Sequence, residues 1–203
     1  MPATQTTLVV IRGNSGSGKT TLAKAVREAY GQRGLAIVSQ DVVRREMLRE
    51  LDVTGGVNIG LIKTICLHAL THGHHVVLEG ILTGSRYGEM LDGLRRDHQG
   101  PATFFYMDVP WEETLLRHET RPQRSQFTPQ QMAEWFTERD LLPGGYEHLL
   151  DHALSVESAT QHILQTAGLV STPSGSAQPG PHERAEKGDA RTRQAGTSER
   201  GSP

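Results

Sequence analysis

Eight residues near the N-terminus have the types and the spacing needed to hold a phosphate chain. Their sequence, GNSGSGKT, fits the pattern G-x-x-x-x-G-K-[ST] in full. Glycines let the backbone curve closely around phosphate oxygens, and a helix that begins beyond the loop adds partial positive charge. Lys19 is expected to reach the β- and γ-phosphates, while the Thr20 hydroxyl helps to hold Mg²⁺. The sequence therefore predicts binding of a nucleoside triphosphate with magnesium. The predicted nucleotide-binding residues are Gly13, Asn14, Ser15, Gly16, Ser17, Gly18, Lys19, Thr20 and Thr21.

A second candidate group follows the apolar segment Leu35–Ser39. Asp41 comes two residues after this segment and Arg44 three residues later. A carboxylate at this point could orient an acceptor hydroxyl and take its proton during phosphoryl transfer. Arg44 could clamp an anionic or polyhydroxyl substrate. The alternative for Asp41 is an N-cap of the next helix, a position that aspartate favours, and one residue can serve both purposes.

A third candidate group follows the apolar segment His75–Leu78. Glu79 is predicted to bind a magnesium-bound water or a substrate hydroxyl, and Gly80 to leave room beside it. A plain surface carboxylate at the end of a strand is the alternative. Arg86 is expected to line the acceptor pocket.

Arginines follow the fourth apolar segment. Arg117, Arg121 and Arg124 lie in and just after a predicted helix that Pro122 interrupts. Arginines in a closing segment neutralise charge on a transferring phosphoryl group. We therefore expect at least one of Arg117, Arg121 and Arg124 to act on the transferring phosphoryl group, and a short lid to span about 121–128. A basic, solvated helix end is the alternative.

Strand and helix patterns alternate through residues 6–170, which predicts a parallel sheet with helices on both faces. The expected fold class is α/β, a three-layer P-loop NTPase fold with a five-stranded parallel sheet and a short lid. The predicted strands are Thr7–Ile11, Leu35–Ser39, His75–Leu78, Thr103–Val109 and Leu154–Val156. The predicted helices are Lys19–Tyr30, Val42–Leu51, a helix with the apolar face Leu61, Ile62, Ile65, Cys66, Ala69 and Leu70, then Glu112–Glu119, Pro129–Arg139 and Ala159–Ala167. Ligands of such sheets lie beyond the carboxyl ends of the strands, where all the candidates fall.

The order of these motifs resembles the P-loop small-molecule kinases of the adenylate, shikimate and gluconate kinase type. It is also similar to the chloramphenicol phosphotransferase and zeta-toxin branch. The resemblance covers about residues 6–168 and rests on GNSGSGKTTLAK, SQD, VVLEG and DVPWEETLLRHETR. It implies ATP-dependent transfer of the γ-phosphoryl group to a small-molecule hydroxyl, an acidic residue at Asp41, and lid arginines at Arg117 and Arg121.

Composition narrows the class of protein. The 203 residues carry a formal net charge of −2, so we expect no nucleic-acid partner. A single cysteine, the lack of a signal-peptide pattern and the lack of a long apolar run predict a cytoplasmic protein with no membrane partner. After Val170 the only apolar side chains besides proline are alanines. We therefore expect a kinase domain over 1–170 and a disordered tail over 171–203.

The function expected from these observations is an ATP- and Mg²⁺-dependent kinase that phosphorylates a small molecule such as an antibiotic, nucleoside or sugar. We expect a monomer or homodimer. The alternative is a P-loop switch module that binds or hydrolyses nucleotide and acts on a protein partner. A guanine-specific switch would need a motif such as N-K-x-D, which is absent downstream of the loop.

Overall fold

Five parallel strands form one sheet at the centre of the molecule. The computed structural model describes residues 5–119 and 128–170. The strand order is β2-β3-β1-β4-β5, so that β1 lies in the middle. The strands are β1 (Leu8–Gly13), β2 (Leu35–Ser39), β3 (His75–Glu79), β4 (Ala102–Asp108) and β5 (Glu147–Asp151).

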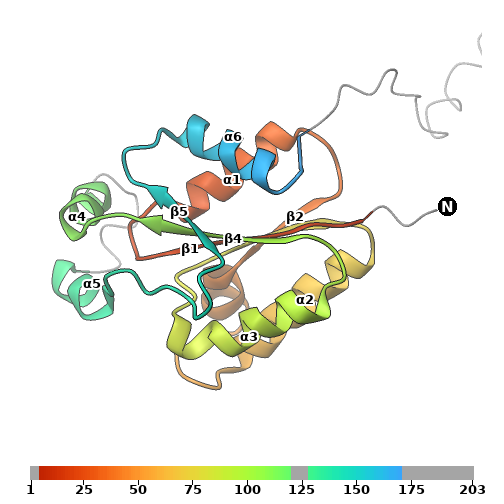
Figure 1. The fold of residues 1–203 in the computed structure, drawn as a ribbon. Coiled ribbons are helices and arrows are strands. Elements are labelled where there is room, and N and C mark those ends of the chain that lie inside the picture. The colour runs from red at the N-terminus through yellow and green to blue at the C-terminus, as the bar shows by residue number, and fades with distance from the viewer. Residues whose placement is uncertain (1–4, 120–127, 171–203) are drawn as a thin grey trace, which may run out of the picture. The chain divides into compact units, whose positions relative to one another are not determined.

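Helices cover both faces of the sheet. They are α1 (Lys19–Tyr30), the short π-helix η1 (Val42–Met47), α2 (Val57–Thr71), α3 (Gly84–Asp97), α4 (Trp111–Glu119), α5 (Pro129–Trp135) and α6 (Val156–Thr166). In Figure 1, α1 and α6 lie on one face and α2 and α3 on the other, while α4 and α5 lie beyond the carboxyl ends of the strands. Among the described residues no helix is long and apolar enough to cross a membrane.

The burial of strand β1 on both faces explains why polar and apolar residues do not alternate along it. All six of its residues are buried. Val9 and Ile11 belong to the core beneath α1 and α6, whereas Leu8 and Val10 belong to the core beneath α2 and α3. Because both faces are covered, the strand is apolar on both sides. The predicted three-layer α/β architecture with a five-stranded parallel sheet is confirmed.

Several of the predicted elements have other bounds in the structure. The fifth strand lies at Glu147–Asp151 rather than at Leu154–Val156. It is an edge strand in which only Leu150 is buried, so its apolar signal is weak. The final helix begins earlier than predicted, at Val156, because Ser155 accepts a hydrogen bond from the Ser158 N–H and caps it.

The helix predicted over Val42–Leu51 is shorter and is the π-helix Val42–Met47. Arg49 adopts a positive φ of 52° just beyond it, a conformation that a helix cannot continue through. Helix α5 similarly ends at Trp135, before the predicted Arg139, since Phe136 is extended. Helix α3 was not predicted at all. The predicted lid, apart from Thr128, and the tail lie outside the described residues.

A half-buried histidine makes the stability of the fold depend on pH. The Thr7 N–H donates to His75 Nδ1 at 3.0 Å, and burial lowers the pKa of His75. The folded state therefore favours the neutral ring, so stability is full above the ordinary pKa of about 6.5 and falls as the pH drops through the lower folded value. We expect His75→Gln to flatten this fall by less than about 1 kcal/mol, since the half-exposed ring is screened by water. Urea unfolding at pH 7 and pH 5 measures it. His74→Gln, an exposed neighbour, is the control and leaves the fall unchanged; an equal effect of both substitutions would refute this role.

Candidate active site

The loop after β1 is held in its curved form by close contacts that only glycine allows. Gly13 has a φ of 144°, and a Cβ there would lie 2.9 Å from the Met107 carbonyl oxygen. Gly16 has a φ of 87°, and its Cβ would lie 2.9 Å from the Thr114 carbonyl oxygen of α4. Both contacts are with backbone, which cannot move aside cheaply. These glycines therefore fit the loop against β4 and α4 as well as shaping it for phosphate.

Lysine and threonine at the start of α1 are positioned by this loop. Lys19 is buried, and its Nζ donates to the Asn14 carbonyl oxygen at 2.7 Å and to Ser17 Oγ at 3.2 Å. The first turn of α1 itself holds no acidic residue. A phosphate at this helix end would replace the loop atoms as the partner of the lysine.

Glu79 and Thr20 meet beside the loop. The Thr20 hydroxyl lies 3.2 and 3.1 Å from the two carboxylate oxygens of Glu79. Glu79 pairs in register with Ser39 on β2 and Ile11 on β1, and it is almost fully buried. The alternative of a plain surface carboxylate is therefore wrong. Hydroxyl and carboxylate oxygens are the ligands that Mg²⁺ prefers, so this pair fits the predicted metal.

Gly80 does not leave room beside Glu79, contrary to the prediction. A Cβ on Gly80 would lie 2.5 Å from Gln40 Oε1, so the space beside Glu79 is already filled by this buried glutamine. Gln40 Oε1 also accepts from the Leu82 N–H at 3.0 Å, which ties the end of β2 to the loop after β3. The role of Gln40 was missed, although it lies within the SQD motif.

Asn14 and the remaining loop residues take different positions. The Asn14 side chain exchanges two hydrogen bonds with the backbone of Thr137, at 2.8 and 3.1 Å. It therefore connects the loop to the chain after α5, and only its backbone is available to a ligand. Ser17 is buried, Ser15 is half-buried, and Thr21 is exposed on the first turn of α1.

Asp41 lies at the carboxyl end of β2, as predicted, with two arginines against it. Its Oδ1 atom is 3.1 Å from Arg44 NH2 and 3.1 Å from Arg45 Nε. Asp41 occupies the N-cap position of η1, as the alternative held, but its carboxylate makes no capping hydrogen bond to this helix. Arg44 is buried, and its Nε finds no acceptor within the described part of the chain. The pairing with Arg45 was missed.

Arg86 is held by a carboxylate that was not foreseen. Its NH1 lies 2.8 Å from Asp52 Oδ2, and the hydroxyl of Tyr87 lies 2.7 Å from Asp52 Oδ1. Burial raises the pKa of Tyr87, and the hydrogen bond with Asp52 raises it further. The same hydroxyl lies 2.8 Å from Asn58 Oδ1. Arg86 and Tyr87 thus fix the loop between η1 and α2.

A second carboxylate of this loop, that of Glu50, is hydrogen-bonded to the first turn of α2. Glu50 accepts hydrogen bonds from the backbone N–H groups of Val57 and Asn58, at 2.7 and 2.8 Å, and from the Asn58 side chain at 3.0 Å. The bond from the Asn58 backbone is the main reason that the pKa of Glu50 is lowered. Arg44 NH1 in turn donates to the Glu50 carbonyl oxygen at 3.2 Å. The loop is therefore tied to α2, α3 and η1 together.

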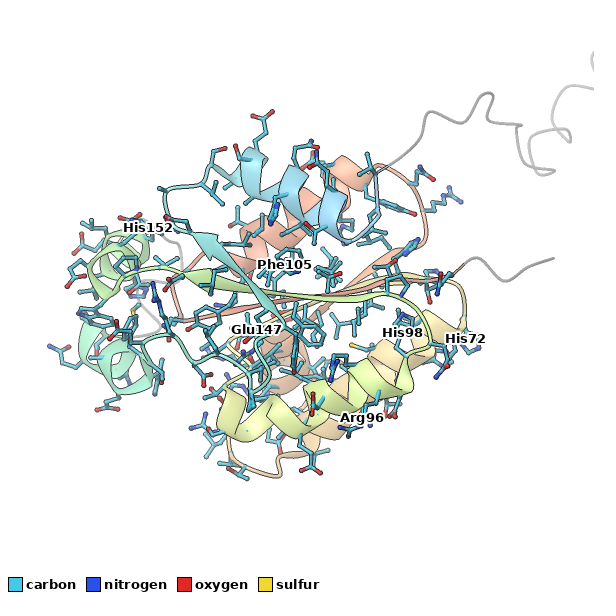
Figure 2. The ribbon with its side chains drawn as sticks, viewed as in Figure 1. His72, Arg96, His98, Phe105, Glu147 and His152 are labelled. Atoms are coloured by element: carbon cyan, nitrogen blue, oxygen red, sulfur yellow. The ribbon has the colours of Figure 1, made fainter. Side chains whose placement is uncertain are left out.

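Arg117, on α4, contacts the phosphate loop from the side of β4 and β5. Its NH1 donates to the Ser17 carbonyl oxygen at 3.0 Å, and its Nε to Glu113 at 2.7 Å. A third bond, from NH2 to the His152 carbonyl oxygen at 3.2 Å, joins it to the loop after β5; Figure 2 labels His152 near α4. The structure thus brings Arg117 to the loop, whereas Arg121 and Arg124 lie outside the described residues.

A buried arginine directly before the loop is the largest feature that the sequence did not reveal. Arg12 has no exposed surface, and it contacts Glu147 Oε1 at 2.7 Å and Asp140 Oδ2 at 3.0 Å. Its Nε donates to the Leu82 carbonyl oxygen at 2.9 Å. Glu147, labelled in Figure 2, begins β5. These contacts fix the end of β1 to the loop after β3 and to β5.

A pocket of about 430 Å³ opens on the β4 and β5 side of the phosphate loop. It lies away from Asp41, Glu79 and Arg86, which lie at or after the ends of β2 and β3, on the other side of β1. The rings of Trp111 and Phe136 line it and meet edge to face, 5.2 Å between centroids. The candidate site therefore has two parts: the pocket on the β4 and β5 side of the phosphate loop, and the group of Asp41, Glu79 and Arg86 on the β2 and β3 side.

Comparisons with known proteins agree with this fold. A family model described as an AAA domain matches residues 8–140. No curated protein matches the chain. Similar solved structures include a gluconokinase from Sinorhizobium meliloti 1021 (19% identity, TM-score 0.54, covering 81% of this chain and 95% of that one). They also include the Deinococcus radiodurans tunicamycin resistance protein (17%, 0.59, 81% and 97%) and the Mycobacterium tuberculosis APS kinase in complex with AMPPNP and APS (16%, 0.60, 79% and 96%). At these identities the likeness confirms the predicted P-loop kinase fold.

Proposed function

This chain belongs to the AAA domain family whose model matches residues 8–140, and from that premise we propose that it is an ATP- and Mg²⁺-dependent kinase. It transfers the γ-phosphoryl group of ATP to a hydroxyl of a small molecule. The observation that carries the proposal is the meeting of Thr20 with Glu79 beside the phosphate loop, with Asp41 at the neighbouring strand end. Solved structures of the same fold that are named as kinases support it.

In the proposed reaction the acceptor hydroxyl oxygen attacks the γ-phosphorus, and the bond from that phosphorus to the β–γ bridging oxygen breaks. Asp41 orients the hydroxyl and takes its proton, and ADP leaves. Lys19 neutralises charge on the β- and γ-phosphates. Thr20 and Glu79 would hold Mg²⁺, directly or through its waters, and the metal when bound neutralises charge on the same phosphates. Each group lies at the carboxyl edge of the sheet, where such a reaction would take place.

The two sides of the site receive different parts of the reactants. We assign the nucleoside to the β4 and β5 side, which the pocket of about 430 Å³ and the contact of Arg117 with the His152 carbonyl oxygen border. The acceptor lies on the β2 and β3 side, against Arg44 and Arg86. Arg117, together with Arg121, stabilises the transferring phosphoryl group. This division keeps the γ-phosphate in the middle, above the loop.

Transfer of label tests the proposal. With Mg²⁺ and γ-labelled ATP, a panel of sugars, nucleosides and antibiotics is expected to yield at least one labelled product.

Glu79→Gln should raise the Mg²⁺ concentration needed for half-maximal rate by about 10-fold, because loss of a group that positions a metal weakens its binding by such factors. Tight nucleotide binding with label released only as inorganic phosphate, and a protein that co-purifies, would favour the switch module instead.

Glu113→Gln provides the matched control for the metal dependence. It removes a carboxylate that lies 2.7 Å from Arg117 but has no place in the proposed metal site. The Mg²⁺ concentration for half-maximal rate is expected to stay at its wild-type value. An equal shift in both variants would show that the effect of Glu79 is not specific to the metal.

A further inference from the structure

The arginines on the acceptor side already have carboxylate partners. Arg44 and Arg45 both lie 3.1 Å from Asp41, and Arg86 lies 2.8 Å from Asp52. An anionic acceptor that bound one of these guanidinium groups would lie beside a carboxylate that already pairs with it. That carboxylate would repel the incoming anion.

Asp52 is the carboxylate most firmly placed against its arginine. One oxygen contacts Arg86 and the other contacts the buried Tyr87 hydroxyl, at 2.8 and 2.7 Å. The Asp52 side chain is about one-quarter exposed, at 23%. It therefore occupies Arg86 in the way that a carboxylate or phosphate of a substrate would.

The acidic and basic residues of this region balance. Residues 41–58 contain four acidic and three basic side chains, and Arg86 makes the basic count four, so the sum is zero. The members are Asp41, Glu46, Glu50 and Asp52, against Arg44, Arg45, Arg49 and Arg86. Glu79 adds one further negative charge. No net positive field is left for an anion.

Apolar side chains are exposed along the same segment. Leu51 is 78% exposed and Val57 is 68% exposed, values that leave most of each side chain in water. The exposed apolar residues here are Met47, Leu48, Leu51, Val53 and Val57. Five such residues within eleven positions offer more apolar surface than single scattered residues do. A partly apolar ligand would cover it favourably.

We propose that the acceptor is an uncharged hydroxyl compound with an apolar part, which lies against Leu51 and Val57, and that Asp52 excludes anionic acceptors by occupying Arg86. The proposal rests on the proposed kinase function and narrows its substrate class. Specificity then comes partly from repulsion, since an anion meets the Asp52 carboxylate before it can reach the arginine. A neutral hydroxyl compound meets no such charge.

Binding of two matched probes tests this. With Mg²⁺ and saturating AMPPNP in the phosphate loop, n-hexyl β-D-glucoside and n-hexyl β-D-glucuronide differ only in a CH₂OH that becomes a carboxylate. Titration calorimetry on the wild-type protein is expected to show the glucoside binding about 10-fold more tightly or better. Asp52→Asn should bring the two dissociation constants to within about 2-fold of each other, because it frees Arg86 while keeping an oxygen that Tyr87 can contact.

Asp92→Asn is the matched control. Asp92 lies on the same helix as Arg86 and pairs with Arg95 and Arg96, so the substitution frees arginines away from the acceptor side and should leave the preference unchanged. Leu51→Ser should weaken the glucoside at least about 3-fold, as expected for loss of a partly covered leucine. The proposal is overturned if the glucuronide binds as tightly as the glucoside, if Asp52→Asn leaves the preference intact, or if neither probe binds.

Two further outcomes separate this proposal from its alternatives. If the chain sediments as a dimer that Leu51→Ser dissociates, a second copy covers the apolar residues and the proposal is wrong. The binding measurement requires no phosphoryl transfer. A failure of transfer to every acceptor in the labelled panel therefore counts against the kinase function, whereas a preference for the glucuronide counts against the substrate class.

Discussion

Replacing Asp41 by asparagine is expected to lower phosphoryl transfer by about 10²-fold or more while the affinity for MgATP stays unchanged. The reason lies in how the carboxylate is held. Both ion pairs, to Arg44 and to Arg45, use Oδ1. Within the described residues Oδ2 has no hydrogen-bond partner, and the side chain is 66% exposed. This oxygen is therefore available to orient an acceptor hydroxyl and take its proton.

Asparagine keeps the shape of Asp41 but presents an amide, which takes a proton far less readily than a carboxylate. Steady-state rates with the acceptor found in the labelled panel, together with nucleotide binding by calorimetry, measure the two quantities separately. Asp41→Glu should retain part of the activity, because it keeps a carboxylate on a longer side chain. This distinguishes loss of the proton acceptor from loss of the two ion pairs, since glutamate can still pair with arginine.

The control for Asp41 is Asp97→Asn, on the last turn of α3. Asp97 forms an exposed ion pair with Lys63, 2.8 Å long, so the chemical change is the same at a position remote from β1 and β2. Transfer is expected to stay at the wild-type rate. A wild-type rate for Asp41→Asn as well would show that the reaction proceeds without this carboxylate, and the assignment of the acceptor side would fall with it.

The candidate site was predictable from sequence wherever a residue follows directly from a strand. Gly13–Thr20, Asp41 and Glu79 each come within two residues of an apolar run, and parallel strands bring their carboxyl ends together. The contact of Thr20 with Glu79, at 3.1 and 3.2 Å, is the clearest result of that rule. Local sequence was sufficient here because the sheet supplies the long-range geometry.

Residues whose partners are distant in sequence could not be predicted in this way. Arg12 contacts Asp140 and Glu147, which are 128 and 135 residues away, and no local pattern joins them. Asp52 likewise meets Arg86 and Tyr87 across 34 and 35 residues. Charged residues in loops are commonly solvated, so their burial or pairing is decided only by tertiary packing.

The prediction of secondary structure failed for helix α3 and for strand β5, and the physical reasons differ. Helix α3 has glycine at positions 84, 88 and 93, which lowers its intrinsic propensity. Its buried residues nevertheless recur at helical spacing, namely Tyr87, Met90, Leu91 and Leu94, and this signal would have revealed it. Strand β5 had no such signal, because an edge strand with one buried residue relies on pairing with β4 instead of on its own apolar pattern.

Arg12 carries the largest expected effect on stability. Arg12→Met is expected to lower the free energy of unfolding by about 3–5 kcal/mol, because it leaves the carboxylates of Asp140 and Glu147 without their cation. The Glu147 side chain is only 2% exposed, so water cannot replace the lost partner. Urea unfolding measures the change, and the midpoint should fall by more than about 1 M.

An exposed arginine gives the scale against which this loss is judged. Arg139 pairs with Asp108 at 2.9 Å, but its side chain is 61% exposed. Arg139→Met removes the same kind of ion pair, and it should cost less than about 1 kcal/mol because solvent screens surface pairs. Equal losses for Arg12→Met and Arg139→Met would contradict a special role for the buried cation.

The double variant Arg12→Met with Glu147→Gln separates charge from packing. If the cost of Arg12→Met comes from an uncompensated buried carboxylate, removing that carboxylate should recover at least about 1 kcal/mol, and the two substitutions will be non-additive. A loss of packing alone would instead make the double variant the sum of the singles.

Because Arg12 directly precedes Gly13, the same cation that stabilises the fold also fixes where the phosphate loop begins. We therefore expect Arg12→Met to weaken MgATP binding even at temperatures where the variant remains folded, which titration calorimetry measures.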